Sequence, residues 1–283
     1  MNDAASAGPH GVLGPADSSA GVGGAAAVGR RYGVPDVAQV GGPILLVLAD
    51  SLAFHGPERA EPADEPRLWP NVAATALGGR AELVAGIGWT ARHAWHALTH
   101  DPRVWALMPT VDALVLGVGG MDTLPSPLPT AVRELIPALR PDGLRRAVRA
   151  GYLRAQPPLA RTLASVVPGG GPVALPPRLT VRYLERCRRA VLALRPGIPV
   201  VAVLPPVHRA AVYGSVHAGR AAAEYATRAW ARGCGAALLD LRALVGEHVL
   251  GGHGNPDGMH WGWQAHAAVG AACAELLHPR VER

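Results

Sequence analysis

Short, continuous apolar runs recur along the chain from residue 43 onward, and each is about the length of a strand. Strands covered on both faces show unbroken apolar runs rather than an alternating pattern. The predicted strands are 43–49, 81–87, 112–118, 199–205 and 236–240. Segments with a helical pattern lie between and after them, at 66–78, 91–100, 127–140, 180–194, 219–232, 241–250 and 263–277. This order predicts an α/β fold, a three-layer α/β/α sandwich around a five-stranded parallel sheet.

The pattern also divides the chain. Residues 1–40 are rich in Gly, Ala and Ser and show no periodicity, so we expect a disordered tail before a single catalytic domain at 41–283. A Pro-rich, basic insertion at about 123–180 interrupts the strand–helix alternation. Two interpretations stay open for it. It forms a lid over the strand ends, or it is a solvated surface extension of a chain with biased composition.

Composition limits the kinds of partner that we expect the chain to bind. The net charge is +6, and all 27 basic residues are arginine. The chain has no helix-turn-helix, zinc-finger or RNA-binding signature, so we expect an anionic small molecule or an acidic carrier protein rather than nucleic acid. The three cysteines lack metal-ligand spacing, and we expect no metal. No apolar run approaches the roughly 20 residues that span a bilayer, and the N-terminus lacks the pattern of a signal peptide, so we expect a cytoplasmic protein.

Two polar groups stand where chemistry is expected. Asp50 and Ser51 follow the first predicted strand directly, and ligands of parallel sheets bind at the carboxyl ends of the strands. Near the C-terminus, Asp257 and His260 are three residues apart after a turn signal. A carboxylate at this spacing can orient an imidazole, which can then take a proton from a nearby hydroxyl.

In this combination the sequence resembles the SGNH, or GDSL-type, hydrolases. Their blocks read G-D-S, a glycine, G-x-N-D and D-x-x-H, and here "ADS" (49–51), "GIGWT" (86–90), "GGMD" (119–122) and "DGMH" (257–260) occur in that order. The resemblance implies a flavodoxin-like fold with Ser51 as nucleophile, His260 as general base and Asp257 as its orienting carboxylate. It also implies an oxyanion hole made from the backbone N–H groups of Ser51 and Gly88.

The third block departs from this pattern. Met121 stands where the family has an asparagine, and a thioether has no hydrogen to donate to an oxyanion. Two donors suffice, or another group substitutes, or the match is off by one residue. Asp50 and Asp122 either hold turns or, together with Trp89, contact substrate. His55 shows no ligand spacing. His266 resembles the histidine that follows the catalytic one in the family, and it is expected to pack as a helix residue.

Further stretches resemble one actinobacterial group within the superfamily, the diglucosylglycerate octanoyltransferases. The similar stretches are "RLWPNVAATAL", "IGWTARHAW", "GGMDTLPSPLPTAVRELI", "RPGIPVVAVLPPVH", "YGSVHAGRA" and "GNPDGMHW". The resemblance implies transfer of an octanoyl group to a hydroxyl of a glucosylated glycerate, in the synthesis of methylglucose lipopolysaccharides. It implies no cofactor, and an acyl donor that is octanoyl-CoA or an octanoyl carrier protein. A plain esterase or thioesterase is the alternative, and a basic sugar-binding module with a relict site is a second.

Overall fold

The computed structural model describes residues 42–128, 132 and 135–281. The tail predicted for residues 1–40 lies outside these residues, as does part of the helix predicted for 127–140. Within the described part of the chain, no helix combines the length and the apolar character needed to cross a membrane.

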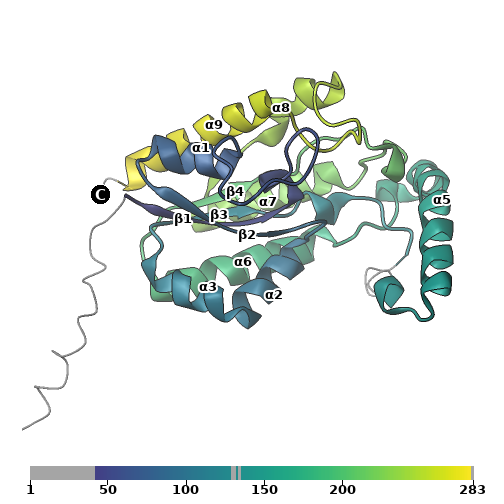
Figure 1. The fold of residues 1–283 in the computed structure, drawn as a ribbon, viewed down its shortest axis with the longest axis horizontal. Helices are drawn as coiled ribbons and strands as arrows, with labels where there is room; N and C mark the ends of the chain where they lie inside the picture. The colour runs from purple at the N-terminus through teal and green to yellow at the C-terminus, as the bar shows by residue number, and fades with distance from the viewer. Residues whose placement is uncertain (1–41, 129–131, 133–134, 282–283) are drawn as a thin grey trace, which may run out of the picture. The chain divides into compact units, whose positions relative to one another are not determined.

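A five-stranded sheet forms the middle layer, as the sequence predicts (Figure 1). The strands are β1 (Ile44–Asp50), β2 (Arg80–Gly86), β3 (Ala113–Gly117), β4 (Val200–Val203) and β5 (Ala237–Leu239). They lie in the order β2-β1-β3-β4-β5, and every neighbouring pair is parallel. Because β1 lies between β2 and β3, the loops that follow these three strands meet at one edge of the sheet.

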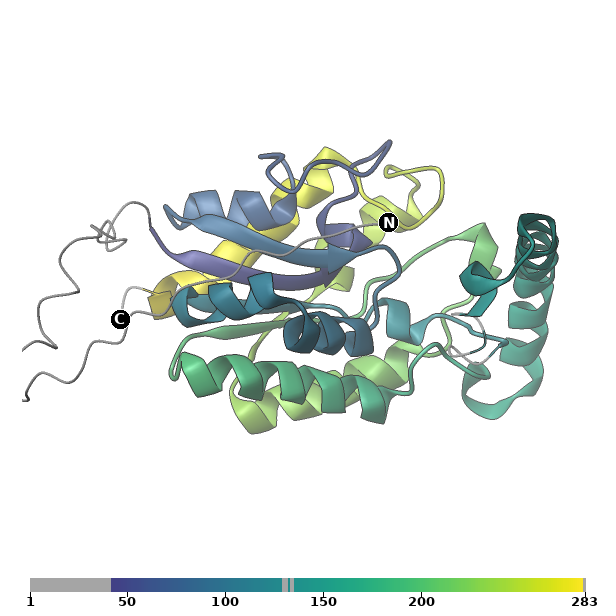
Figure 2. The same cartoon turned by 60° about the horizontal axis from the view of Figure 1, so that its bottom comes forward.

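Helices cover both faces of the sheet, which confirms the three layers (Figures 1 and 2). One face carries α1 (Trp69–Ala76), α8 (Leu241–Leu250) and α9 (Trp263–Val281). The other carries α2 (Ala91–His100), α3 (Pro102–Leu107), α6 (Pro177–Leu194) and α7 (Arg220–Cys234). The sequence patterns predict the bounds of α2 and α8 to the residue, whereas α3 was not predicted.

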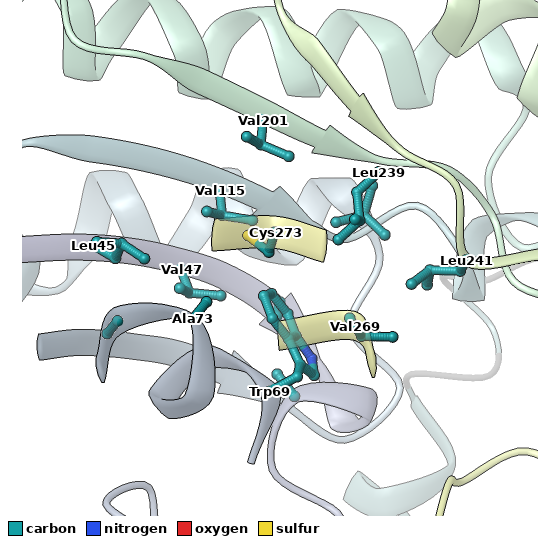
Figure 3. Packing of buried hydrophobic residues seen from close by; sticks show 14 of the residues in the cluster. Leu45, Val47, Trp69, Ala73, Val115, Val201, Leu239, Leu241, Val269 and Cys273 are labelled. Atoms are coloured by element: carbon teal, nitrogen blue, oxygen red, sulfur yellow. The ribbon is translucent and has the colours of Figure 1, made fainter. Parts of the chain in front are cut away.

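Side chains of β1 alternate between the two apolar cores. Leu45 and Val47 pack with Trp69 and Val269 on the α1–α9 side (Figure 3), while Leu46 and Leu48 pack on the α2–α6 side. All four β1 side chains are fully buried. A strand with both faces covered needs apolar residues at consecutive positions, which explains the continuous run.

The insertion contains a helix that the sequence analysis missed. Helix α5 (Asp142–Val166) has 25 residues and continues through Pro157 and Pro158. Prolines disfavour helix interiors, so their presence argued against a helix here. Only Gln156 and Ala160 of α5 are buried, and the helix stands beyond the carboxyl ends of the strands (Figures 1 and 2). Whether it closes over the site as a lid stays a prediction.

Because side chains of the central strands are fully buried, truncating one of them should lower the free energy of unfolding substantially. Leu114 of β3 is fully buried, so Leu114→Ala should lower the free energy of unfolding by about 2–5 kcal/mol through lost burial and a residual cavity. Leu194 at the end of α6 is 51% exposed, and Leu194→Ala should change it by no more than about 0.5 kcal/mol. Urea unfolding followed by circular dichroism measures both, and equal losses would contradict this description of the core.

Candidate active site

The turn after β1 presents Ser51. Asp50, the last residue of β1, accepts a hydrogen bond from the Leu52 N–H at 3.0 Å and so caps the short 3₁₀ helix η1 (Ser51–Ala53). The Ser51 carbonyl accepts hydrogen bonds from the N–H groups of Phe54 at 3.2 Å and His55 at 2.8 Å. The turn is thereby closed on itself, and the Ser51 side chain points out of it at the carboxyl edge of the sheet.

Ser51 meets the C-terminal pair found in the sequence. The Ser51 Oγ lies 2.9 Å from His260 Nε2, and His260 Nδ1 lies 2.5 Å from Asp257 Oδ2. Both distances are those of hydrogen bonds. The structure therefore joins a hydroxyl, an imidazole and a carboxylate in one line, although Ser51 and His260 are 209 residues apart.

Asn255 organises the loop that carries this pair. Its Oδ1 accepts the Asp257 N–H at 2.9 Å, and its Nδ2 donates to the Pro57 carbonyl at 2.7 Å. Asp257 Oδ1 in turn accepts the N–H groups of Met259 and His260. Asn255 thus ties the His260 loop to the segment that follows Ser51. In the sequence, Asn255 and Pro256 form the turn signal before Asp257, and a bond to a distant carbonyl leaves no local pattern.

The surroundings set the charges of the pair. Burial lowers the pKa of His260, because it disfavours the imidazolium, and this outweighs the opposite effect of Asp257. Partial burial raises the pKa of Asp257, but hydrogen bonds from Met259 and His260 more than offset it, so that the net pKa is lowered. At neutral pH the site therefore holds a charged carboxylate beside a neutral imidazole, the state in which His260 Nε2 can accept a proton.

The second and third blocks meet beside this edge. Gly88, in the turn after β2, has a φ of +70°, a conformation that favours glycine. A Cβ added to Gly88 would lie 3.8 Å from Met121 Cε, so Met121 packs against this turn. Met121 thus brings a thioether, which has no hydrogen to donate, to the position of the third block. The oxyanion role of the Ser51 and Gly88 N–H groups stays a prediction.

The three candidate substrate-binding residues have partners inside the protein. Asp122 is buried and accepts hydrogen bonds from the Ala91 N–H at 3.0 Å and the Thr180 hydroxyl at 2.8 Å. It thereby holds the start of α2 against α6. Burial raises the pKa of Asp50 and of Asp122 to about 7. Trp89 packs over Gly86 and lines a hollow beside α2 and α3. Contact of these side chains with substrate stays a prediction.

No grouping of three or more His, Cys, Asp or Glu side chains within the described ranges could hold a metal ion. A neutral imidazole hydrogen-bonded to a hydroxyl, and oriented by a carboxylate, activates that hydroxyl for attack on an acyl carbon.

Comparison with known proteins supports acyl chemistry. No family model matches the chain. The diglucosylglycerate octanoyltransferase of Mycolicibacterium hassiacum is 51% identical over 235 residues, which are 83% of this chain and 93% of that protein. The protein of the same name from Mycobacterium tuberculosis is 50% identical over 235 residues, 83% of this chain and 90% of its own length.

Solved structures share the fold at low identity. A lipase/acylhydrolase from Enterococcus faecalis superposes with a TM-score of 0.52 at 10% identity, over 84% of this chain and 96% of its own. A protein described as a GDSL-like lipase, from Parabacteroides merdae, gives a TM-score of 0.55 at 12% identity, also over 84% and 96%.

These relatives are enzymes, and identity of this degree carries the enzyme class over to the chain, so the sugar-binding module with a relict site is not retained. The chain belongs to the family of the diglucosylglycerate octanoyltransferases, acyl-transferring enzymes of the serine type built on the SGNH, or GDSL-type, hydrolase fold.

Proposed function

We propose that the chain moves an octanoyl group, through an acyl-enzyme on Ser51, to a hydroxyl of diglucosylglycerate in methylglucose lipopolysaccharide synthesis. The acceptor and the acyl group come from the names of the two relatives. The observation that carries the mechanism is the unbroken line from Ser51 Oγ to His260 Nε2 at 2.9 Å and from His260 Nδ1 to Asp257 Oδ2 at 2.5 Å.

The line supports a two-step transfer. Ser51 Oγ attacks the carbonyl carbon of the donor while His260 Nε2 takes the hydroxyl proton, and the leaving group departs with that proton. An acceptor hydroxyl then attacks the acyl carbon and gives its proton to His260. The bond between the acyl carbon and Ser51 Oγ breaks, and His260 passes the proton to Oγ, which restores the Ser51 hydroxyl. Asp257 holds the imidazole and stabilises its positive charge in both steps. The Ser51 and Gly88 N–H groups would stabilise the oxyanion, where one donor contributes about 3–4 kcal/mol.

We propose that the acyl donor is anionic, either octanoyl-CoA or an octanoyl carrier protein, because the structure contains a hollow lined by arginine side chains. Ile136 and Pro137 wall this hollow together with five side chains of α5. Those of α5 are Arg145, Arg146, Arg149, Tyr152 and Leu153. Guanidinium groups bind phosphate oxygens bidentately, and both donors carry phosphate next to a pantetheine arm. The hollow lies on the side of the sheet where the strands end, which a long flexible arm could bridge to Ser51.

Hydrolysis is the second candidate function. The solved neighbours include lipases. The Asp257 side chain is 42% exposed, so water reaches the outer end of the line of three side chains. Water in place of the sugar hydroxyl would make the chain an esterase or thioesterase by the same first step.

Product analysis separates the two functions. Purified protein incubated with octanoyl-CoA and diglucosylglycerate should give octanoylated sugar in excess over free octanoate by mass spectrometry. Ser51→Ala should lose at least about 1,000-fold of this activity, because the nucleophile is gone. Ser165→Ala, an exposed hydroxyl on α5, is the matched control and should retain it. Release of free octanoate at the same rate with and without sugar would contradict the transferase and support the hydrolase.

The lowered pKa of His260 predicts the acid limb of the pH profile. Reactivity of Ser51 toward a fluorophosphonate probe requires neutral His260, so it is lost as the pH falls through that pKa. Because burial lowers the pKa from its usual 6.5, half-maximal labelling should occur below pH 6.5. In Asp257→Asn the carboxylate that raises the His260 pKa is removed, so the limb should move further down and labelling should slow. A midpoint at or above 6.5 would contradict the electrostatics described.

If the basic hollow binds the donor phosphate, substitutions in it should change KM for a donor that carries phosphate but not for one that lacks it. Arg146→Ala/Arg149→Ala should raise KM for octanoyl-CoA by about tenfold, since charge-assisted hydrogen bonds to phosphate are lost. KM for the octanoyl thioester of N-acetylcysteamine, which lacks phosphate, should not change. Arg232→Ala/Arg242→Ala removes the same charge from exposed positions on α7 and α8 and serves as control. Equal changes in KM for both donors would show that the hollow does not bind the donor phosphate.

A further inference from the structure

A second histidine covers one face of the His260 ring. The imidazoles of His55 and His260 are stacked, with ring centroids 3.8 Å apart and an angle of 19° between their planes. His55 lies four residues after Ser51, in the segment that leaves the nucleophile turn. His55 is not part of the hydrogen-bonded chain of Ser51, His260 and Asp257, and its sequence context predicts no role for it.

The His55 ring is held in place from its own segment. Its Nδ1 lies 2.7 Å from the Gly56 carbonyl, and because a carbonyl only accepts, Nδ1 carries the hydrogen. The His55 backbone N–H donates to the Ser51 carbonyl at 2.8 Å. The ring and the nucleophile turn are therefore parts of one hydrogen-bonded unit.

A buried histidine of α9 holds the same segment from the other side. His266 Nε2 donates to the His55 carbonyl at 3.1 Å, and His266 Nδ1 accepts the Trp69 N–H at 3.2 Å. His266 is fully buried, and burial lowers its pKa to about 4, so the ring stays neutral and keeps both bonds. His266 was predicted to be a packed helix residue, and the structure adds that it anchors the backbone of His55 to the start of α1.

We propose that His55 is a positioning residue for His260. Its ring fixes the plane of the imidazole so that Nε2 stays directed at Ser51 Oγ. This inference rests on the proposed role of His260 as the base. Asp257 and Ser51 hold the two ring nitrogens at the edge of the imidazole, and neither bond holds its face. The Asp257 side chain is also 42% exposed, so support on the ring face limits rotation. A parallel ring over the imidazole face supplies that support.

The charges around His260 give the stack a second consequence. His260 faces Asp257 on its own loop, Ser51 and His55 on the nucleophile turn, and His266 on α9. Of these groups Asp257 favours the imidazolium, whereas a protonated His55 opposes it by repulsion. Removing the His55 imidazole should therefore raise the pKa of His260 and move the acid limb toward higher pH.

Two variants separate the ring from its hydrogen bond. His55→Phe keeps an aromatic face over His260 but removes the ionisable nitrogens. His55→Asn keeps a donor for the Gly56 carbonyl but removes the ring. The readout is the rate of Ser51 labelling by a fluorophosphonate probe across pH, which needs neither donor nor sugar. Thermal melts of all proteins report whether the variants fold.

The expected results differ between the variants. His55→Asn should label about three- to tenfold more slowly than wild type at the pH optimum, the range that an aromatic pair contributes. His55→Phe should stay within about twofold of wild type at the optimum while its acid limb moves to higher pH. Equal rates and unmoved limbs in both folded variants would overturn the inference. Labelling without octanoyl transfer to sugar would instead leave His55 in its role and reject the proposed function.

Discussion

The hydrogen bond between Ser51 Oγ and His260 Nε2 is the interaction on which the site depends. It joins the end of the first strand to the loop before the last helix, so it forms only when the whole sheet is assembled. The order β2-β1-β3 places the Ser51 turn between the Gly88 turn and the Met121 turn. The parallel sheet thus gathers at one edge groups that the chain carries far apart.

Several contacts remote from the reacting atoms hold this hydrogen bond in geometry. Asn255 ties the His260 loop to Pro57, and His266 ties the segment after Ser51 to α1. Asp122 holds α2 against α6 beside the third block. Asp122 and His266 are buried, and hydrogen-bonded polar groups in the interior rigidify what they join. The site is therefore supported from both helical layers of the sandwich.

The sequence predicts the layers and the Ser51, Asp257 and His260 constellation because both leave local patterns. A strand covered on both faces must be apolar at consecutive positions, as in Leu45 to Leu48, and the polar residues that follow it are conspicuous. His55 and Asn255 leave no such pattern, since a ring stack and a bond to the Pro57 carbonyl join positions unrelated by period. Helix α5 was missed because Pro157 and Pro158 argue against a helix, and its mostly exposed surface gives little apolar periodicity.

The most direct test of the account is to look for the acyl-enzyme itself. The protein is mixed with octanoyl-CoA, quenched in acid, and digested for peptide mass spectrometry. The account predicts one octanoyl adduct, on the peptide that contains Ser51, which disappears when diglucosylglycerate is added while octanoylated sugar forms. Octanoylated sugar formed rapidly with no adduct on Ser51, or with the acyl group on another side chain, would contradict it.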